Sequence, residues 1–236
     1  VTETAVLCAM SEEQQRLYEI EKSKARNILI EKFRSSGTQN SSVIVLRALM
    51  MLRQLANHPR LLDSGSEAGS GKFTEVTESL ETVLAENHKV LVFSSFVRHL
   101  KLLEEYCISR GHRYAMLTGS TTNREKVIRS FKQETDTRLF LISLKAGGVG
   151  LNLTEAGYVF ILDPWWNPAA EMQALNRAHR IGQDKSVFVY RFITKDTVEE
   201  KIVRLQQKKQ ELADIFVNSD TQIAGMSQEE IMLMFD

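Results

Sequence analysis

The sequence has little of what marks secreted, metal-binding and membrane proteins. Its only two cysteines, Cys8 and Cys107, form no CxxC pair, so neither a disulfide scaffold nor a zinc site is indicated. This cysteine usage fits a reducing intracellular compartment. No apolar run approaches the length of a membrane span, and no secretory signal pattern opens the chain. We therefore expect an intracellular protein with no metal site and no membrane partner.

An excess of either charge is also missing. The 30 Lys and Arg residues balance the 30 Asp and Glu residues, which gives a formal net charge of zero. Strong stand-alone nucleic-acid binders usually carry a basic excess, so any DNA contact here must depend on local patches. At 236 residues, 43% of them hydrophobic, the chain can bury a sizeable core in one or two domains. It begins at Val1 rather than methionine, which we interpret as the mark of a fragment.

A complete ATP site is the third absence. Gly71 and Lys72 suggest a P-loop, but Phe73 follows where Ser or Thr is required, and Ser66 occupies the first glycine position. The chain has no acidic DEAH-type strand end either, so the usual phosphate loop and the magnesium carboxylate are both missing. We expect this chain alone to hydrolyse no ATP.

From Lys72 onward, strands alternate with helices, which is typical of a parallel α/β sheet. Strands are expected at 89–94, 113–117, 138–142, 158–162 and 186–193, and helices at 73–87 and 96–109. A capping box of Thr122 and Glu125 should open a further helix, and Asn167 should cap one that starts at Pro168.

Helices also dominate the two ends of the chain. After a strand within 1–10, two helices, 11–33 and one that stops before Pro59, predict a helical hairpin. The first helix should place Leu17, Ile20, Lys24 and Ile28 on one face. The composition of 64–71 predicts a flexible linker. Near the C-terminus, capping boxes of Asp196 with Glu199 and of Ser227 with Glu230 should open a long helix to about residue 217 and a short last one.

The most informative stretch is 143–183, which combines a glycine-rich turn, a buried strand and a helix with two arginines. Glycines in the turn let the backbone approach a ligand closely. The helix should place Met172, Leu175 and Ala178 on one side and Gln173, Arg177 and Arg180 on the other. Paired arginines beside such a turn suit phosphate charge, whereas an isolated RxxR is usually a solvated helix face.

This stretch resembles the C-terminal motor lobe of the Swi/Snf-type DNA-translocating ATPases of helicase superfamily two. SLKAGGVGLNL resembles their motif V, DPWWNP the segment after it, and QALNRAHRIGQ their motif VI. Asn176 stands where many members carry Asp, which affects a local hydrogen bond and not the assignment. The resemblance covers nearly the whole chain.

The resemblance implies an α/β fold, a RecA-like parallel sheet sandwiched by helices, with an N-terminal helical hairpin and a C-terminal brace helix. The expected domains are a lead-in strand and hairpin at 1–63, a linker at 64–71, the RecA-like lobe at 72–195, the brace helix at 196–217 and a tail at 218–236. It also implies ATP with Mg²⁺, bound mainly by an N-terminal RecA-like lobe that this chain lacks.

Turns at the carboxyl ends of parallel strands are where such folds bind ligands. Three of them carry small hydroxyls or amides that suit phosphate oxygens, and we predict a sequence-independent track for the DNA backbone. The predicted contacts are Ser94, Ser95, Thr118, Gly119, Ser120, Ser143 and Lys145. The alternative is that these Ser and Thr residues only cap their own helices.

Further site residues follow from the resemblance alone. It implies arginine fingers at Arg177 and Arg180, and it places Trp165 and Trp166 near the DNA path, although a tryptophan after a strand is more often a core residue. The nucleotide should lie beside Gly148, Gly150, Asn152 and Gln173.

The function predicted is therefore the C-terminal lobe of an ATP-dependent double-stranded DNA translocase or remodeller. The alternatives are a catalytically silent RecA-like module that binds partners and the matching lobe of an RNA helicase. Expected partners are double-stranded DNA, the N-terminal lobe of the same protein and a DNA-bound protein substrate, with the chain itself a monomer. It would work at the nucleoid of a bacterium or in the nucleus of a eukaryote.

Overall fold

The computed structural model describes residues 1–36, 42–146, 151–165, 168–178, 186–211 and 225–236. The chain divides into two compact units. The first, which we call the sheet unit, contains Val1–Cys8 and Phe73–Ile193. The second, the hairpin unit, contains Ala9–Lys72 and Thr194–Asp236. The hairpin and the C-terminal helices thus belong to one unit, while the domain boundaries given above stay a prediction.

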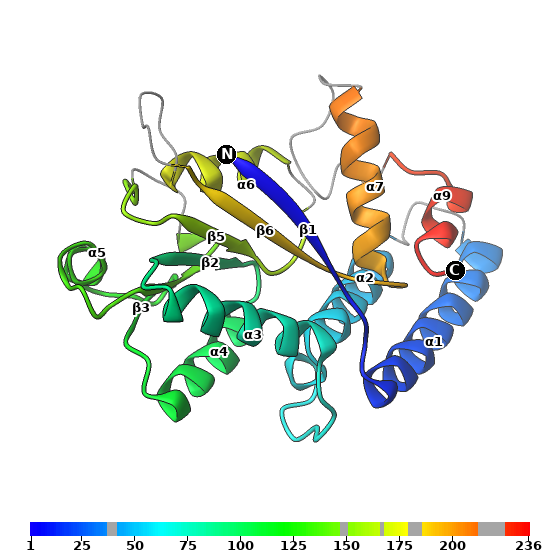
Figure 1. Ribbon diagram of the computed structural model, residues 1–236. Helices are drawn as coiled ribbons and strands as arrows, with labels where there is room; N and C mark the ends of the chain where they lie inside the picture. The colour runs from blue at the N-terminus through cyan, green and yellow to red at the C-terminus, as the bar shows by residue number, and fades with distance from the viewer. Residues whose placement is uncertain (37–41, 147–150, 166–167, 179–185, 212–224) are drawn as a thin grey trace. The chain divides into compact units, whose positions relative to one another are not determined.

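The sheet unit is built on a six-stranded sheet with the order β1-β6-β5-β2-β4-β3. The strands are β1 (Thr2–Cys8), β2 (Val90–Ser94), β3 (Tyr114–Leu117), β4 (Leu139–Ser143), β5 (Tyr158–Ile161) and β6 (Phe188–Thr194). Strand β2 pairs in parallel with β4 and β5, β3 with β4, and β5 with β6. Figure 1 shows β1 running in the same direction as its neighbour β6. Strands appear in all the expected places.

The burial of the central strands β2 and β4 explains why continuous apolar runs predicted strands here. Every residue of β2 (VLVFS) and β4 (LFLIS) is buried, as expected when helices cover both faces of a parallel sheet. Alternate side chains enter opposite cores: Leu91 and Phe93 belong to one apolar cluster, and Val90 and Val92 to the other.

Helices cover both faces of this sheet. They are α3 (Gly71–Ala85), α4 (Val97–Arg110), α5 (Arg124–Gln133) and α6 (Pro168–Ala178). Helices α3 and α4 contribute Val76, Leu80 and Leu103 to one cluster, whereas α5 and α6 contribute Phe131 and Leu175 to the other. This two-faced arrangement confirms the predicted α/β, RecA-like fold.

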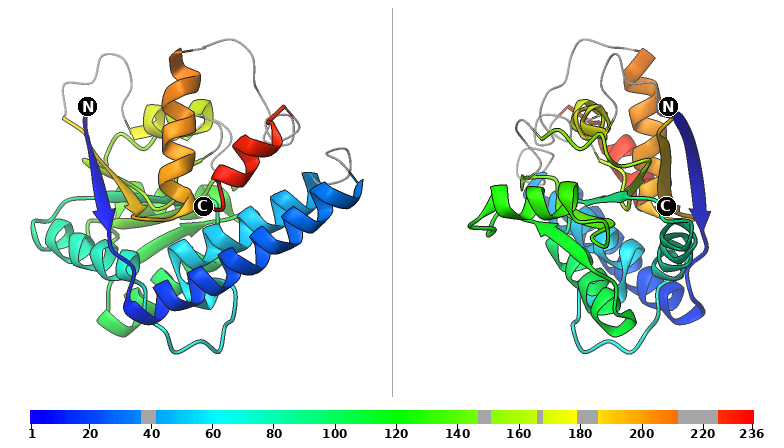
Figure 2. Two further views of the ribbon diagram at one scale, coloured as in Figure 1. Left: turned by 90° about the vertical axis from the view of Figure 1, so that its right-hand side faces the viewer. Right: turned by 60° about the vertical axis from the view of Figure 1, so that its left-hand side comes forward.

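The hairpin unit is helical. It contains α1 (Glu12–Ser36), α2 (Ser42–Asn57), the short 3₁₀ helix η1 (Pro59–Leu61), α7 (Val198–Glu211) and α9 (Gln228–Leu233). Figure 2 shows α1 and α2 side by side as a hairpin, with α9 against α1, and α2 also contacts α7. None of the described helices is long and apolar enough to cross a membrane.

The buried face of α1 differs from the predicted apolar face. Ile20 and Ile28 are 38% and 53% exposed, while Gln14, Tyr18 and Leu29 are buried. The Gln14 amide donates to the Leu55 carbonyl, so hydrogen bonding as well as apolarity sets which side of α1 faces inward. Periodicity of apolar residues does not register such polar contacts.

Two of the three predicted capping boxes are wrong. Asn123, not Thr122, caps α5 by accepting from the Lys126 amide. Glu199 does not reach back to Asp196, because its carboxylate turns into the interior of the hairpin unit. The box of Ser227 and Glu230 is confirmed, with both reciprocal hydrogen bonds formed.

The expected flexible linker is fixed at its C-terminal end. Ser70 is buried and donates to the Asn57 carbonyl at 2.6 Å, and Ser11 donates to the Gly69 carbonyl at 2.8 Å. Helix α3 already begins at Gly71 rather than Phe73. A Cβ on Gly71 would lie 1.6 Å from the Ala9 carbonyl oxygen, so this glycine is required for close packing and not for phosphate.

Candidate functional site

The three strand-end turns lie along the same edge of the sheet. The parallel register places Ser94 beside Ser143 and Leu117 beside Ile142, so the residues after β2, β4 and β3 emerge next to one another. The Leu144 amide donates to the Ser94 carbonyl at 3.1 Å and thereby links the turn after β4 to the turn after β2. The structure thus assembles the three turns that sequence reasoning selected separately.

Asp163 organises the turn after β2. It is fully buried at the end of β5, where its carboxylate accepts from the Ser94 hydroxyl at 2.6 Å and from the Ser95 amide and hydroxyl. Ser94 in turn accepts from the Phe96 amide at 3.0 Å. Sequence reasoning used Asp163 only as the end of a strand. The sequence feature that could have identified Asp163 is an acidic residue directly after an apolar strand, at the edge of the sheet where ligands bind.

Several predicted contact residues are buried. Ser94, Thr118 and Ser143 are at most 5% exposed: Ser94 and Ser143 are the last residues of the buried strands β2 and β4, and Thr118 directly follows β3. Thr118 shares a hydrogen bond of 2.9 Å with Ser120. The Ser143 hydroxyl has no hydrogen-bond partner among the described residues. Direct contact of these three side chains with DNA therefore does not fit this structure.

The remaining members of the predicted track are accessible. Gly119, Ser120 and Lys145 are exposed, and Ser95 is half-buried. A groove of about 520 Å³ lies beside the turn after β3, and hydroxyl side chains line it. Two lysines, Lys101 and Lys126, also line this groove, and the sequence analysis did not predict them. The accessible hydroxyls, amides and lysines of this edge can together take phosphate oxygens.

Arg124 links the start of α5 to the segment that follows β4. It is the first residue of α5, and its guanidinium donates to the Ala146 carbonyl, the last described residue before 151. The contact holds the exit from β4 against α5. Sequence reasoning missed Arg124 because its partner comes from a different turn.

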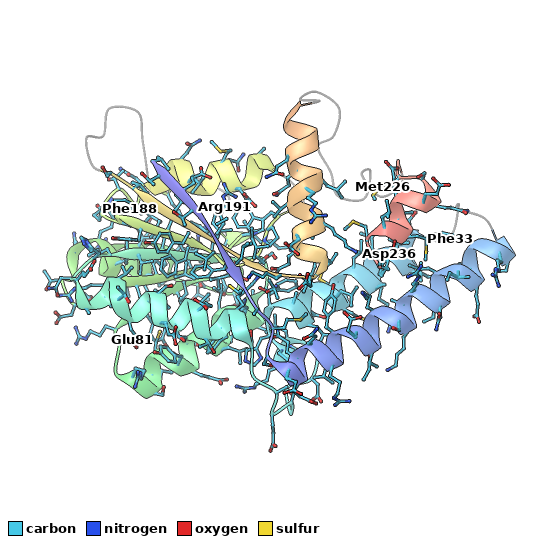
Figure 3. The ribbon with its side chains drawn as sticks, turned by 45° about the vertical axis from the view of Figure 1, so that its right-hand side comes forward. Phe33, Glu81, Phe188, Arg191, Met226 and Asp236 are labelled. Carbon is cyan, nitrogen blue, oxygen red and sulfur yellow. The ribbon has the colours of Figure 1, made fainter. Side chains whose placement is uncertain are left out.

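A buried glutamate anchors α6, the helix that contains Arg177, one of the two predicted fingers. Glu171, in the first turn of α6, accepts from the Trp165 amide at 3.0 Å and pairs with Arg191. Arg191, labelled in Figure 3, lies on β6 and also pairs with Glu3 of β1 at 3.1 Å. Trp165 is only 3% exposed and packs edge-on against Phe93. Its position supports the interpretation as a core residue over contact with DNA.

The inward face of α6 also differs from the prediction. Leu175 is buried as expected, but Met172 is 48% exposed, because Glu171 rather than Met172 faces the core. Gln173 is exposed on α6, and Asn152 is exposed after the glycine-rich turn. Arg177 belongs to α6, but its side chain is outside the structural description. The predicted site residues Gly148, Gly150, Trp166 and Arg180 lie outside the described residues.

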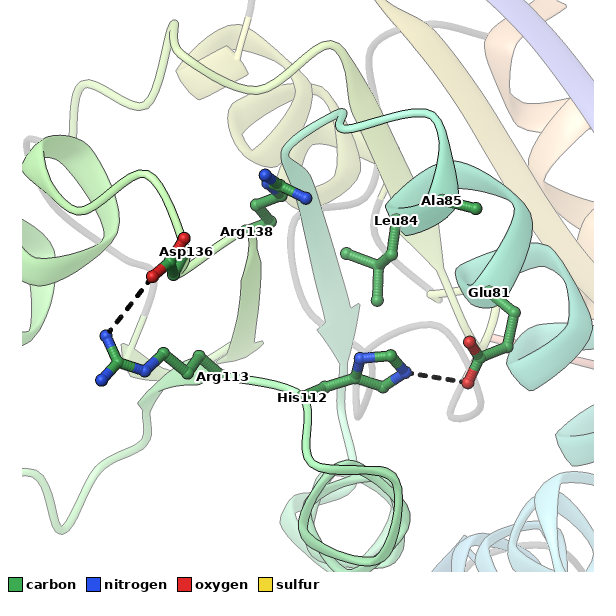
Figure 4. Close-up of a pocket in the computed structure, with 7 residues that line it drawn as sticks. All are labelled: Glu81, Leu84, Ala85, His112, Arg113, Asp136 and Arg138. Carbon is green, nitrogen blue, oxygen red and sulfur yellow. Dashed lines mark hydrogen bonds and ion pairs between the residues drawn. The ribbon is translucent and has the colours of Figure 1, made fainter.

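A separate polar pocket of about 290 Å³ lies at the amino ends of the strands (Figure 4). Glu81 accepts from the Tyr106 hydroxyl at 2.6 Å and contacts His112 Nε2 at 2.9 Å. Burial alone would raise the pKa of Glu81, but these two hydrogen bonds and the charges of His112 and Arg110 lower it overall. Opposite Glu81, Arg113 faces Asp136 at 4.0 Å. This pocket is at the other end of the strands from the predicted track, and no sequence signal pointed to it.

Comparison with known proteins identifies the family. The family described as helicase conserved C-terminal domain matches residues 72–182. The solved C-terminal domain of the Sulfolobus solfataricus SWI2/SNF2 ATPase superimposes with a TM-score of 0.80 and is 30% identical, over 98% of this chain and 96% of that one. The chain belongs to the SWI2/SNF2 ATPase family. The resemblance seen in the sequence is thereby confirmed.

Other SWI2/SNF2 proteins match over most of the chain. The mouse "SWI/SNF-related matrix-associated actin-dependent regulator of chromatin subfamily A member 1" is 38% identical over 224 residues, which cover 87% of this chain and 21% of that protein. The S. solfataricus SWI2/SNF2 ATPase core in complex with dsDNA has a TM-score of 0.82 and 31% identity, over 98% of this chain and 49% of that one. The chain thus spans about a fifth of the length of this curated relative.

Proposed function

We propose that this SWI2/SNF2 lobe is half of an ATP-driven motor that moves along double-stranded DNA. The observation that carries the proposal is the alignment of three strand-end turns on one edge of the sheet, in a chain of this ATPase family. Such an edge offers phosphate-binding groups at regular intervals without reading bases, which is what movement along any DNA sequence requires. The S. solfataricus relative in complex with dsDNA supports it.

On the nucleotide side, an N-terminal lobe of the same protein would bind ATP and Mg²⁺. This chain would present Arg177 and Arg180 as arginine fingers, because a planar guanidinium stabilises the charge that spreads over the transferring phosphoryl oxygens. Gly148, Gly150, Asn152 and Gln173 would line the nucleotide; of these the two described residues, Asn152 and Gln173, have exposed side chains. Glu171 would set the position of α6 through Trp165 and Arg191.

On the DNA side, the accessible residues would make the contacts and the buried ones would shape the turns. Phosphates would bind at Ser95, Gly119, Ser120 and Lys145, and along the groove that contains Lys101 and Lys126. Binding through phosphates weakens steeply with salt, and the zero net charge limits its strength. Ser94 would shape the turn after β2 through the Phe96 amide, and Thr118 would shape the turn after β3 through the Ser120 hydroxyl. Ser143 would lie buried beneath the track.

The remaining partner proposals follow from the same motor. A protein bound to the DNA would be the substrate that the motor displaces or remodels, with this chain acting as a monomer. A motor of this kind would work wherever the genome lies, in the nucleus of a eukaryote or at a bacterial nucleoid.

The test uses the full-length enzyme. Arg180→Ala and Arg177→Ala should each reduce DNA-stimulated ATP hydrolysis by roughly 10³-fold, as for other arginine fingers, with melting temperature and DNA affinity near wild type. Arg129→Ala is the matched control, because Arg129 is an exposed arginine of α5 that does not line the groove of the proposed DNA track. Near-normal turnover in both finger variants would overturn the assignment, and loss of turnover with unfolding would indicate a structural role instead.

A salt titration separates the DNA track from unspecific loss of function. Lys145→Ala should weaken DNA binding for all sequences and reduce the slope of log affinity against log salt by about 1. Binding that prefers one sequence, or that does not change with salt, would contradict a backbone track.

A further inference from the structure

Three polar side chains meet in the interior of the hairpin unit, and the proposed reaction uses none of them. Lys72 and Glu199 are both 0% exposed. The Lys72 ammonium donates to both Glu199 carboxylate oxygens, at 2.6 and 2.7 Å, and to Asn57 Oδ1 at 3.2 Å. These residues come from the start of α3, the first turn of α7 and the end of α2.

Each Glu199 oxygen also accepts a second hydrogen bond. The Asn57 side-chain amide donates to Oε1 at 3.1 Å, and the Thr194 main-chain amide donates to Oε2 at 2.8 Å. The carboxylate therefore fixes three groups at once, each from a different segment of the chain. We call Lys72, Glu199 and Asn57 the buried triad.

A second layer of hydrogen bonds surrounds the buried triad. The Ser70 hydroxyl donates to the Asn57 carbonyl at 2.6 Å, and the Thr194 hydroxyl donates to the Ala56 carbonyl at 2.7 Å. The Val198 amide donates to the Tyr18 hydroxyl at 2.8 Å, and burial raises the pKa of this tyrosine. The hairpin helices, the start of α3 and the start of α7 are thus linked through directional contacts.

The turn before α7 needs such support. Asp196 has a φ of +57°, a left-handed conformation that is unfavourable for a residue other than glycine. The Asp196 amide donates to Glu200 at 2.6 Å, and the Thr197 hydroxyl donates to the Thr194 carbonyl at 2.7 Å. With the bond from the Thr194 amide to Glu199, these contacts fix the direction in which α7 begins.

Stability alone gives no reason for a buried ion pair. Removing two charges from water costs about as much as their attraction returns, and apolar residues of similar volume often serve as well or better. What an apolar contact cannot do is fix orientation, because it has no direction. The place of the buried triad in the chain is therefore informative: the chain passes from one unit to the other three times, between Cys8 and Ala9, between Lys72 and Phe73, and between Ile193 and Thr194. Lys72 and Thr194, which both bond to Glu199, are the hairpin-unit ends of the second and third of these connections.

We propose that Lys72 and Glu199 are positioning residues that hold α7 at a fixed orientation to the hairpin helices α1 and α2. The motor needs this fixed orientation to convert ATP hydrolysis into movement along DNA. A movement that reaches the hairpin unit through the connections at Lys72 and Thr194 then displaces the hairpin and α7 together rather than one of them alone. The inference rests on the proposed motor function.

The decisive variant is Lys72→Met combined with Glu199→Gln in the full-length enzyme. It removes both charges together and keeps an amide oxygen as acceptor for the Thr194 amide. We expect its melting temperature within a few degrees of wild type and its DNA-stimulated hydrolysis within about threefold. The number of base pairs moved per ATP should fall at least tenfold, because the pair sets orientation. Lys72→Met alone, which leaves a buried carboxylate without its counter-charge, should melt roughly 10 °C lower.

The matched control removes an exposed ion pair of the same unit. Arg16→Met with Glu13→Gln deletes a 2.6 Å ion pair on the surface of α1. It should change neither the melting temperature nor the coupling, by which we mean the number of base pairs moved per ATP. Wild-type coupling in the buried double variant would overturn the proposal, as would a parallel loss of hydrolysis and movement. If the double variant does not fold, Asn57→Ala tests the proposal instead, because it keeps the ion pair and removes the hydrogen bonds of the Asn57 side chain to Lys72 and Glu199. It should lower coupling about threefold, and unchanged coupling would overturn the proposal.

The two proposals fail in different measurements. A wild-type enzyme without DNA-stimulated hydrolysis refutes the motor function itself, whereas the positioning role fails only in the comparison of the variants with an active wild type.

Discussion

Two fully buried carboxylates in this protein are stabilised in different ways. Glu199, in the hairpin unit, faces the ammonium of Lys72. Asp163, in the sheet unit, accepts from the hydroxyls of Ser94 and Ser95 and from the Ser95 amide. The first is a closed ion pair among helices, and the second holds a turn at the edge of the sheet that we propose as the DNA track. One buried carboxylate thus connects helices of the hairpin unit, and the other shapes a turn at the end of a strand.

The difference has consequences for energy and function. Breaking a buried ion pair leaves one uncompensated charge, which costs about 3–5 kcal/mol, while a lost hydrogen bond to a charged group costs about 1.5–3 kcal/mol. Loss of the Glu199 charge alone should therefore cost more stability than loss of the Asp163 charge, and damage at Asp163 should also change the shape of the candidate site. The following predictions test this contrast.

The largest effect should come from Glu199→Gln. It leaves Lys72 buried and charged with no carboxylate, so the free energy of unfolding should fall by about 3–5 kcal/mol in urea titrations. Glu13→Gln, at an exposed ion pair, should change it by less than about 0.5 kcal/mol. Similar values for both would mean that burial does not raise the cost of the lost charge.

Gly71→Ala should be the next largest, because it tests packing beside the buried triad without changing a charge. The new Cβ would lie 1.6 Å from the Ala9 carbonyl oxygen, which belongs to the backbone and cannot move aside easily. We expect a loss of about 2–3 kcal/mol in the same titration. Gly69→Ala is the control, since its Cβ would meet nothing within 4 Å, and equal stability of the two variants would refute the close approach.

Asp163→Asn should have a smaller effect on stability and a visible one on DNA binding. It removes the charge that two serine hydroxyls and an amide stabilise, at a cost of about 1–3 kcal/mol, and it loosens the first turn of the predicted track. Calorimetry and a DNA titration measure both quantities. Asp136→Asn, at an exposed carboxylate 4.0 Å from Arg113, should change neither. Unchanged DNA affinity in Asp163→Asn would show that this carboxylate does not contribute to DNA binding.

The smallest effect concerns pH and the pocket of Figure 4. The pKa of Glu81 is lowered in the folded protein, so its contribution is present above the unfolded pKa of about 4.3 and is lost as pH falls through the folded value. Because the side chain is 36% exposed, this contribution should be only a few tenths of a kcal/mol. Wild type should lose slightly more stability than Glu81→Gln between pH 6 and pH 3. Identical pH curves would show that Tyr106 and His112 add nothing.

Local patterns predicted much of this structure. Continuous apolar runs marked β2 and β4 because both faces of these strands are covered, and Pro168 marked the start of α6 because proline fits the first helical turn. The three turns could be assigned to one edge because parallel strands place their carboxyl ends together. The motifs of the glycine-rich turn and α6 carried enough information to identify the family.

Local patterns failed where a polar side chain had two possible partners. Glu199 fits a capping box by spacing, yet Lys72, distant by 127 positions, binds its carboxylate instead. Met172 fits an apolar face, yet Glu171 takes the inward position because Arg191 and the Trp165 amide stabilise it there. In both cases the decisive contact comes from another element, which spacing within one helix does not contain.

The sequence by itself determined the RecA-like sheet, the order of its elements and the membership in the SWI2/SNF2 family, because apolar periodicity and short motifs are local properties. Only the tertiary structure decided which hydroxyls of the predicted track are accessible, and which donors reach Glu199 and Asp163. It also decided that Gly71 and Lys72, which resemble part of a phosphate loop, serve packing and a buried ion pair. The physical reason is that burial and charge compensation depend on segments that the chain brings together only when it folds.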